Sequence, residues 1–187
     1  MSRLFVVSGP SGVGKRTVIK KVLEARPSFK LPISHTTRAP RPDEIDGVDY
    51  HFVTIDIFSG MLARDEFAES VQFPPGVGNL YGTSKAELSG NGDVLIEIEV
   101  QGARQMKAQR PDATLIFLTA SVERIRGRLT RRGDVKEGET ADRLARAEEE
   151  LREGPSLYDH VVSNDGDGLD KAVEAILAII DAQERPR

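Results

Sequence analysis

The sequence predicts an α/β fold in which a parallel sheet carries helices on both faces. Three observations indicate this class. A short apolar segment precedes a glycine-rich turn, apolar residues with helical spacing follow the turn, and strand and helix patterns alternate again in the second half of the chain. Such alternation is typical of parallel sheets, because a crossover between parallel strands is usually a helix. A length of 187 residues fits a single domain spanning 1–187.

The N-terminal unit combines a strand, a turn and a helix. The continuous apolar run in Leu4–Ser8 predicts a short, fully buried strand. The glycine-rich turn Gly9–Gly14 follows it. Apolar side chains at positions 18, 19, 22 and 23 then recur with helical spacing, and Pro27 is expected to stop this helix.

The second half of the chain repeats the alternation. The patterns predict strands over Asp93–Val100, Thr114–Leu118 and His160–Ser163, and helices over Ala103–Gln109, Val122–Arg131, Ala141–Arg152 and Leu169–Ala182. Glu97 and Glu99 would share one face of the first of these strands, because side chains alternate along a strand. Arg146 and Glu150 have the i,i+4 spacing of an ordinary pair on an exposed helix surface.

Residues 34–85 break this rhythm, with prolines at positions 40, 42, 74 and 75. We interpret this stretch as a subdomain inserted into the core. The core itself would then comprise residues 1–33, 86–124 and 150–187.

Composition excludes several classes of function. Lys and Arg number 26 against 30 Asp and Glu, which gives a formal net charge of −4. Proteins that coat phosphate backbones usually carry a basic excess, so no nucleic-acid partner is expected. No apolar run approaches the roughly 18 residues that span a bilayer, and the N-terminus does not resemble a signal peptide, so we expect no membrane association. The absence of cysteine rules out disulfides and thiol chemistry and suits a cytoplasmic protein.

Residues 9–15 match the pattern G-x-x-x-x-G-K between a predicted strand and a predicted helix. In that context, the loop amides and the helix N-terminus face an anion, and the lysine reaches the outer phosphates. The sequence therefore predicts binding of ATP or GTP. The residues expected to contact the nucleotide here are Gly9, Pro10, Ser11, Gly12, Val13, Gly14, Lys15, Arg16 and Thr17.

Arg16 stands where this motif usually carries a Ser or Thr hydroxyl for Mg²⁺. One residue along a helix turns the side chain by about 100°, so Thr17 does not simply replace that hydroxyl. Two alternatives follow: Mg²⁺ is held through waters and the phosphates, or metal binding is weakened.

Beyond this loop, the chain resembles the guanylate kinase family over nearly its whole length. The segments that carry the resemblance are Ser34–Pro42, Asp46–Phe52, Gly78–Thr83, Glu97–Ala103, Arg132-Gly133 with Arg143-Leu144, and Val161–Asp165. The resemblance implies an ATP:GMP phosphotransferase that makes ADP and GDP, with Mg²⁺ accompanying ATP and a role in purine nucleotide metabolism. It also implies that the insert 34–85 binds the acceptor and that residues about 125–149 form a mobile lid.

The resemblance assigns GMP binding to Ser34, Arg38, Arg41, Tyr50, Glu69, Tyr81, Thr83 and Glu99. Two forked guanidiniums and two phenols can hold a dianionic phosphate. A carboxylate that accepts from guanine N1–H and N2–H, beside a hydroxyl that donates to O6, selects guanine over adenine. Glu69 and Thr83 are the matching positions, and unpaired polar groups would penalise another base.

On the donor side, the family pattern favours Arg128, Arg132 and Arg143 as lid residues that close over the phosphates and exclude water. Asn164 is expected on the adenine side. The residues implied in catalysis are Lys15, Arg38, Arg41, Arg132 and Arg143.

Two more departures accompany Arg16. Glu99 stands where the family carries Asp, and an extra methylene moves a carboxylate by about 1.5 Å, enough to affect the rate. The sequence identifies no firm protein ligand for the metal, and Glu99 is a candidate through water. The link Phe73–Val77 is longer than usual and could reshape the base pocket.

Two alternative functions stay open. The first is a related phosphotransferase with another acceptor, dGMP or ribose 1,5-bisphosphate. The second is a non-catalytic guanylate-kinase-like module that binds a phosphorylated protein, for which ATP affinity would be small. Sequence does not decide between a monomer and a homo-oligomer.

Overall fold

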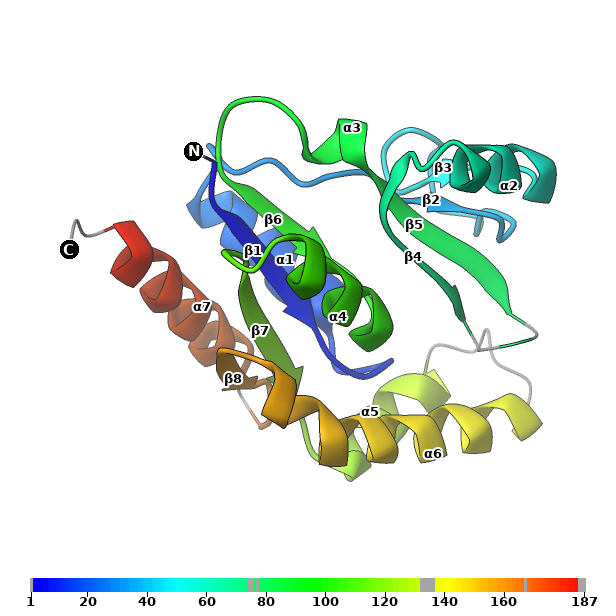
Figure 1. Cartoon of the computed structure of the whole chain (residues 1–187). Helices are drawn as coiled ribbons and strands as arrows, with labels where there is room; N and C mark the ends of the chain where they lie inside the picture. Colours follow the sequence, from blue (N-terminus) through cyan, green and yellow to red (C-terminus); the bar gives the residue numbers. More distant parts are fainter. Residues whose placement is uncertain (1, 74–75, 77, 132–136, 167, 185–187) are drawn as a thin grey trace.

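The computed structural model describes residues 2–73, 76, 78–131, 137–166 and 168–184, which form two sheets (Figure 1). The core sheet has four strands in the order β6-β1-β7-β8, all parallel. These are β1 (Leu4–Ser8), β6 (Val94–Glu97), β7 (Thr114–Thr119) and β8 (His160–Ser163). Strand β1 is central, with Val6 opposite Ile96 on one side and Leu115 on the other. The predicted parallel sheet is therefore confirmed.

Helices cover both faces of this sheet, as predicted. They are α1 (Lys15–Ala25), α5 (Val122–Arg131), α6 (Glu137–Glu153) and α7 (Gly168–Glu184) on one face and α4 (Val100–Gln109) on the other. Because side chains alternate along β1, Phe5 and Val7 pack with the first group, whereas Leu4 and Val6 pack with α4. Both faces of β1 are buried, which explains its unbroken apolar run.

A second sheet comes entirely from the stretch in which the alternation breaks. Its order is β3-β2-β5-β4, and only β2 and β3 pair in parallel. The strands are β2 (His35–Thr36), β3 (His51–Phe52), β4 (Phe67–Phe73) and β5 (Asn79–Ser84), with helices α2 (Ile55–Ala63) and α3 (Lys85–Leu88) beside them. Phe58 of α2 stacks on Phe67 of β4 with 4.4 Å between ring centroids. Because the insert 34–85 is predicted to bind the acceptor, we call this sheet the acceptor sheet.

The predicted strand Asp93–Val100 is wrong at its end. Strand β6 stops at Glu97, and Glu99 is the N-cap residue of α4, which begins at Val100. Glu97 and Glu99 therefore do not share a strand face. Ile98 and Val100 are both buried, so the alternating pattern continues past the point where the chain leaves the sheet.

Other helix ends differ slightly from the predictions. Helix α6 begins at Glu137 rather than Ala141 and ends at Glu153. It reaches from the core toward the far ends of β4 and β5 (Figure 1). A short 3₁₀ helix, η1 (Gly154–Leu157), joins it to β8. In the described part of the chain, no helix has both the length and the apolar character needed to cross a membrane.

Candidate functional site

A cavity of about 1480 Å³ is lined by residues of both sheets. It exceeds the roughly 300–1,000 Å³ of a typical single-ligand site. The predicted site residues that line it are Pro10, Ser11, Gly12, Gly14, Lys15, Arg16, Thr17, Ser34, Arg38, Arg41, Tyr50, Glu69, Tyr81, Glu99, Arg128, Arg143 and Asn164. Gly9, Val13 and Thr83 contribute through contacts described below, whereas Arg132 lies outside the described residues.

The phosphate loop depends on glycine. Gly9, Gly12 and Gly14 have φ values of 146°, 83° and 97°, a region that favours residues without a side chain. A Cβ on Gly9 would lie 2.3 Å from the carbonyl oxygen of Leu118 in β7. The loop leads directly into α1, whose first amides lack partners inside the helix and carry its positive dipole end. This local structure is suited to phosphate.

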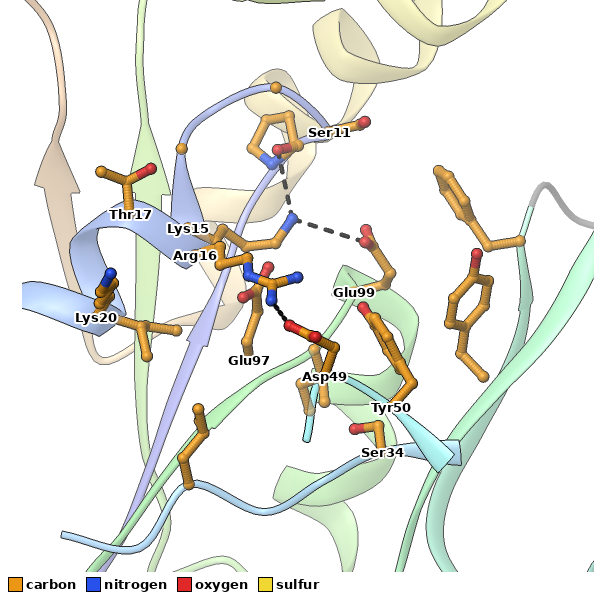
Figure 2. Close-up of a pocket in the computed structure, with 18 of the residues that line it drawn as sticks. Ser11, Lys15, Arg16, Thr17, Lys20, Ser34, Asp49, Tyr50, Glu97 and Glu99 are labelled. Atoms are coloured by element: carbon orange, nitrogen blue, oxygen red, sulfur yellow. Dashed lines mark hydrogen bonds and ion pairs between the residues drawn. The ribbon is translucent and has the colours of Figure 1, made fainter. Parts of the chain in front are cut away.

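Lys15 is held at the mouth of the loop. Its ammonium donates to the carbonyl of Gly9 at 2.6 Å, and its side chain is only 6% exposed. The ammonium also lies 3.7 Å from Glu99 Oε1 (Figure 2). The other Glu99 oxygen is buried without a hydrogen-bond partner among the described residues. A buried carboxylate oxygen without a donor is costly, so Glu99 is suited to bind a water or a hydrated cation.

Two distant residues hold the backbone of the loop. Arg128 of α5 and the Asn164 side-chain amide, directly after β8, both donate to the carbonyl of Val13, at 2.5 and 2.9 Å. Arg128 also donates to the carbonyl of Asn164 at 3.1 Å. The sequence predicts both residues to bind ATP. In the structure, these contacts hold the backbone of the loop in place.

At the opposite end of the cavity, Glu69 and Thr83 form a buried pair. Glu69 Oε1 accepts from the backbone N–H of Thr83 at 2.9 Å and from its hydroxyl at 2.8 Å. The hydroxyl of Ser34 lies 2.9 Å from that of Thr83. Burial raises the pKa of Glu69 to about 7; the hydrogen bonds from Thr83 oppose this rise, and the charge of Glu99 adds to it. The structure therefore brings together the two side chains predicted to recognise guanine, Glu69 and Thr83, with Ser34, which was predicted to bind GMP, beside them.

Helix α4 supports this end through residues that sequence reasoning missed. A Cβ on Gly102 would lie 2.5 Å from Glu69 Oε2, so only glycine leaves room for the carboxylate. Gln105 accepts from the backbone N–H of Ser70 at 3.0 Å and donates to its carbonyl at 2.9 Å. No sequence signal indicated Gly102, because it falls between the predicted strand Asp93–Val100 and the predicted helix Ala103–Gln109.

Glu44 is a second missed residue. Both of its carboxylate oxygens accept from Arg38 Nη2 at 2.9 Å, and Oε2 also accepts from the backbone N–H of Arg41 at 2.9 Å. Burial alone would raise the pKa of Glu44, but the bonds from Arg41 and Arg38 hold it below its ordinary value. Glu44 therefore stays charged and orients the two predicted phosphate-binding arginines. Its position three residues after Arg41 was the available signal.

Tyr50 and Tyr81 complete this region. Their ring centroids are 6.1 Å apart, and the Arg38 guanidinium lies 5.6 Å from the centroid of the Tyr50 ring. Burial raises the pKa of Tyr50 well above its ordinary value, and the charges of Glu97 and Glu99 act in the same direction. At neutral pH the phenol of Tyr50 is therefore a hydrogen-bond donor.

Arg16 forms an ion pair with Asp49, in the segment just before β3 (Figure 2). Its guanidinium thus leaves the phosphate loop and reaches the acceptor sheet. Thr17 lies on the other side of the helix, away from Glu99 (Figure 2).

The prediction of an exposed Arg146–Glu150 pair is wrong. Arg146 lines the cavity, its guanidinium lies 5.8 Å from the centroid of the Phe73 ring, and its buried Nη1 has no hydrogen-bond partner in the described part of the structure. Burial and the charge of Glu99 raise the pKa of Glu150 to about 7. Helix α6 thus faces the cavity at Arg146, and Glu150 lines a smaller pocket that Arg146 and Glu99 also line. Of the link after Phe73, residues 74, 75 and 77 lie outside the described part.

Known proteins share this sequence and fold. The Guanylate kinase family profile matches residues 1–183. A guanylate kinase of Thermus thermophilus is 47% identical, covering 98% of this chain and 82% of its own length. One of Lactococcus lactis is 43% identical, covering 96% and 87%. The crystal structure of guanylate kinase from Anaplasma phagocytophilum matches with a TM-score of 0.79 and 28% identity, covering 99% of this chain and 87% of its own. The chain belongs to the guanylate kinase family.

Proposed function

We propose that this chain transfers the terminal phosphoryl group of ATP to GMP inside the cavity that its two sheets enclose, making ADP and GDP. The reaction is that of its family. One observation supports placing it here: Lys15 of the phosphate loop and the buried carboxylate of Glu69 line the same cavity. A phosphate donor and a guanine acceptor are thus directed into one space.

The donor end would hold ATP by its phosphates. The loop amides, the N-terminus of α1 and Lys15 neutralise their charge, and the cavity-lining Arg128, Arg143 and Asn164 contribute to the same end. Arg132 keeps its predicted role beside them. We place the adenine near Asn164.

Magnesium would enter with ATP. Mg²⁺ keeps several of its waters in proteins, so the unpaired oxygen of Glu99 fits a water of the hydrated ion. When bound, the ion neutralises negative charge on the phosphate oxygens. The described residues contain no group of three His, Asp or Glu that would hold the ion by themselves, so the phosphates would supply most of its ligands.

The acceptor end would read both parts of GMP. Guanine N1–H and N2–H donate to Glu69, whose oxygens each accept more than one hydrogen bond. The hydroxyl of Ser34, or that of Thr83 once it turns away from Glu69, donates to guanine O6. Arg38, Arg41, Tyr50 and Tyr81 hold the phosphate, with Glu44 orienting the arginines. The set requires a purine with donors at N1 and N2 and a phosphomonoester.

The chemical step needs positioning more than proton transfer. A phosphate oxygen of GMP is already anionic, so it attacks the terminal phosphorus of ATP without a general base. The bond from that phosphorus to the bridging oxygen of ADP breaks as the bond to GMP forms. Lys15 and the arginines stabilise the charge on the transferring group, and a closed cavity excludes water that would hydrolyse ATP.

A coupled assay of ADP formation tests this proposal. GMP, dGMP, AMP, CMP, UMP and ribose 1,5-bisphosphate are each supplied with saturating Mg-ATP, and ATP binding is measured by calorimetry. We expect turnover selective for guanine nucleotides. Tight ATP binding with turnover only on ribose 1,5-bisphosphate would indicate the alternative phosphotransferase. Absence of both ATP binding and turnover would indicate the non-catalytic module. The proposal includes the cytoplasmic location that a cysteine-free chain suits.

A further inference from the structure

We propose that the ion pair between Arg16 and Asp49 positions the acceptor-binding segment against the phosphate loop, which makes Arg16 a positioning residue for GMP. The inference rests on the proposed function of this cavity. It also accounts for an arginine at a position where the motif usually supplies a hydroxyl to Mg²⁺.

The pair joins the immediate neighbours of two phosphate ligands. Arg16 follows Lys15 in the first turn of α1, and Asp49 precedes Tyr50 at the edge of the acceptor sheet (Figure 2). One ion pair therefore connects the neighbour of Lys15, which would bind the phosphates of ATP, with the neighbour of Tyr50, which would bind the phosphate of GMP. An arginine is long enough to span this distance, whereas serine is not.

Hydrogen bonds connect the segment around Asp49 internally. Asp49 Oδ2 accepts from the backbone N–H of Ile45 at 2.8 Å, which leaves Oδ1 for Arg16. Asp46 Oδ1 accepts from the N–H of Phe52 at 2.9 Å, and the N–H of Gly47 donates to the carbonyl of Tyr50 at 2.9 Å. Whatever fixes Asp49 therefore also fixes Tyr50.

Burial separates this pair from an ordinary surface pair. Exposed pairs contribute little, because water and salt screen them. The Asp49 side chain is only 11% exposed, although Arg16 is 58% exposed. A carboxylate with so little access to water depends more strongly on its partner.

The pair also complements the attachment at the base end. There, Gln105 of α4 bonds both backbone groups of Ser70 in β4. Arg16 supplies a second connection on the phosphate side, so the acceptor sheet is held to the core at both ends of its binding site. Without the second connection, fewer molecules would have the acceptor residues in place, and the apparent affinity for GMP would fall by that fraction.

Steady-state kinetics of Arg16→Met, Asp49→Asn and the double variant test the inference. Each single variant should raise the KM for GMP about threefold to tenfold, with a smaller change in kcat. The double variant should match the single variants, because all three lack the same contact. In Asp49→Asn, the KM for ATP should stay within about twofold, because the loop that binds ATP is intact. The matched control is Asp170→Asn, which breaks the pair of Lys21 on the same helix, and its KM values should be unchanged.

A distance measurement gives a readout independent of catalysis. The chain has no cysteine, so spin labels at Asp56→Cys on α2 and Glu174→Cys on α7 report the separation of acceptor sheet and core. Asp49→Asn should broaden the distance distribution toward larger values without GMP, and Asp170→Asn should not. Circular dichroism checks that each variant is folded.

Several results would overturn the inference: additive effects of the two substitutions, an unchanged KM for GMP in Asp49→Asn, or a rise in the KM for ATP in Arg16→Met alone. The last would mean that Arg16 acts on the donor directly. A wild-type chain without GMP-dependent turnover would instead contradict the proposed function, and the distance measurement would still test the ion pair.

Discussion

The two ends of the cavity are built in different ways. The donor end is centred on nine consecutive residues, 9–17, whose backbone shape depends on glycines with positive φ and is supported at one carbonyl by Arg128 and Asn164. The acceptor end uses side chains from four separate segments of the chain, and several of them are oriented by other side chains, as Arg38 is by Glu44 and Glu69 is by Thr83. The geometry of the donor end is thus set mainly by the backbone conformation of the loop, and that of the acceptor end by hydrogen bonds among side chains.

This difference indicates which amino-acid substitutions each end of the cavity tolerates. Backbone amides present the same donors whatever the side chain, so the loop tolerates an unusual residue such as Arg16 as long as the glycines remain. In a network, each member depends on its neighbours, so a single substitution affects several contacts. Substitutions at the donor end, other than at Arg16, should therefore act on catalysis as a whole, whereas those at the acceptor end should act on selectivity.

The largest effect should come from Lys15→Met. It removes the ammonium at the mouth of the loop, and loss of one such electrostatic contact costs about 10²–10³-fold in kcat. The change should appear equally with GMP and dGMP, because it lies at the donor end. Lys21→Met, at an exposed position of the same helix, is the control. A Lys15→Met variant with more than a tenth of wild-type kcat would contradict this role.

Next in size should be the effect of Glu69→Gln on GMP. A hydrogen bond to a charged group is worth about 1.5–3 kcal/mol, so kcat/KM for GMP should fall by about 10- to 100-fold. The KM for ATP should hardly change. Assays with GMP and AMP side by side measure the loss of selectivity. An equal loss with both acceptors would mean that Glu69 supports the fold rather than reads the base.

The same variant should stabilise the protein at high pH. Because the pKa of Glu69 rises from 4.5 to about 7 on folding, the folded state binds more protons than the unfolded state between these values, and stability falls as pH rises through this window. Glutamine does not ionise and so does not lose stability in this way, and Glu69→Gln should therefore be about 3 kcal/mol more stable than the wild type at pH 8 and equally stable at pH 4. Urea unfolding at both pH values measures the difference. A gain that is equal at pH 4 and pH 8 would rule out ionisation as its cause.

The smallest effect should come from Arg146→Met. It removes a guanidinium from the ring of Phe73, a contact worth about 0.5–1 kcal/mol, so kcat/KM for GMP should fall by about two- to fivefold. Arg152→Met, at an exposed position of the same helix, should leave kcat/KM unchanged. A loss above 100-fold would instead place Arg146 among the residues that contact the reacting phosphates.

The contrast between the two ends also explains what sequence predicts well. The phosphate loop was found from its own residues, because a contiguous motif between a strand and a helix contains its structural context. The acceptor residues required several spaced motifs in a known order. The parallel core followed from alternating patterns, since burial on both faces of β1 leaves a clear apolar run.

What sequence missed depends on contacts between distant residues. Nothing near Asp49 indicates that Arg16 will reach it, and the position of Gly102 gains meaning only once Glu69 lies against α4. The end of β6 was misplaced because Ile98 and Val100 stay buried after the strand stops. Arg146 was wrongly predicted to be exposed, because i,i+4 spacing identifies neighbours on one helix but does not show which other elements pack against that helix.

The contacts at the carbonyl of Val13 have a consequence for how the protein is made. Its two donors, Arg128 and Asn164, come 115 and 151 residues later in the chain. During synthesis the loop is therefore made well before β8 but gains its final shape only when β8 has joined the sheet. Contacts between residues so far apart in the sequence slow folding, and the segments made first stay incompletely structured until the later segments are present. A chain shortened before β8 would keep the entire nucleotide motif and yet lack the residue that completes it.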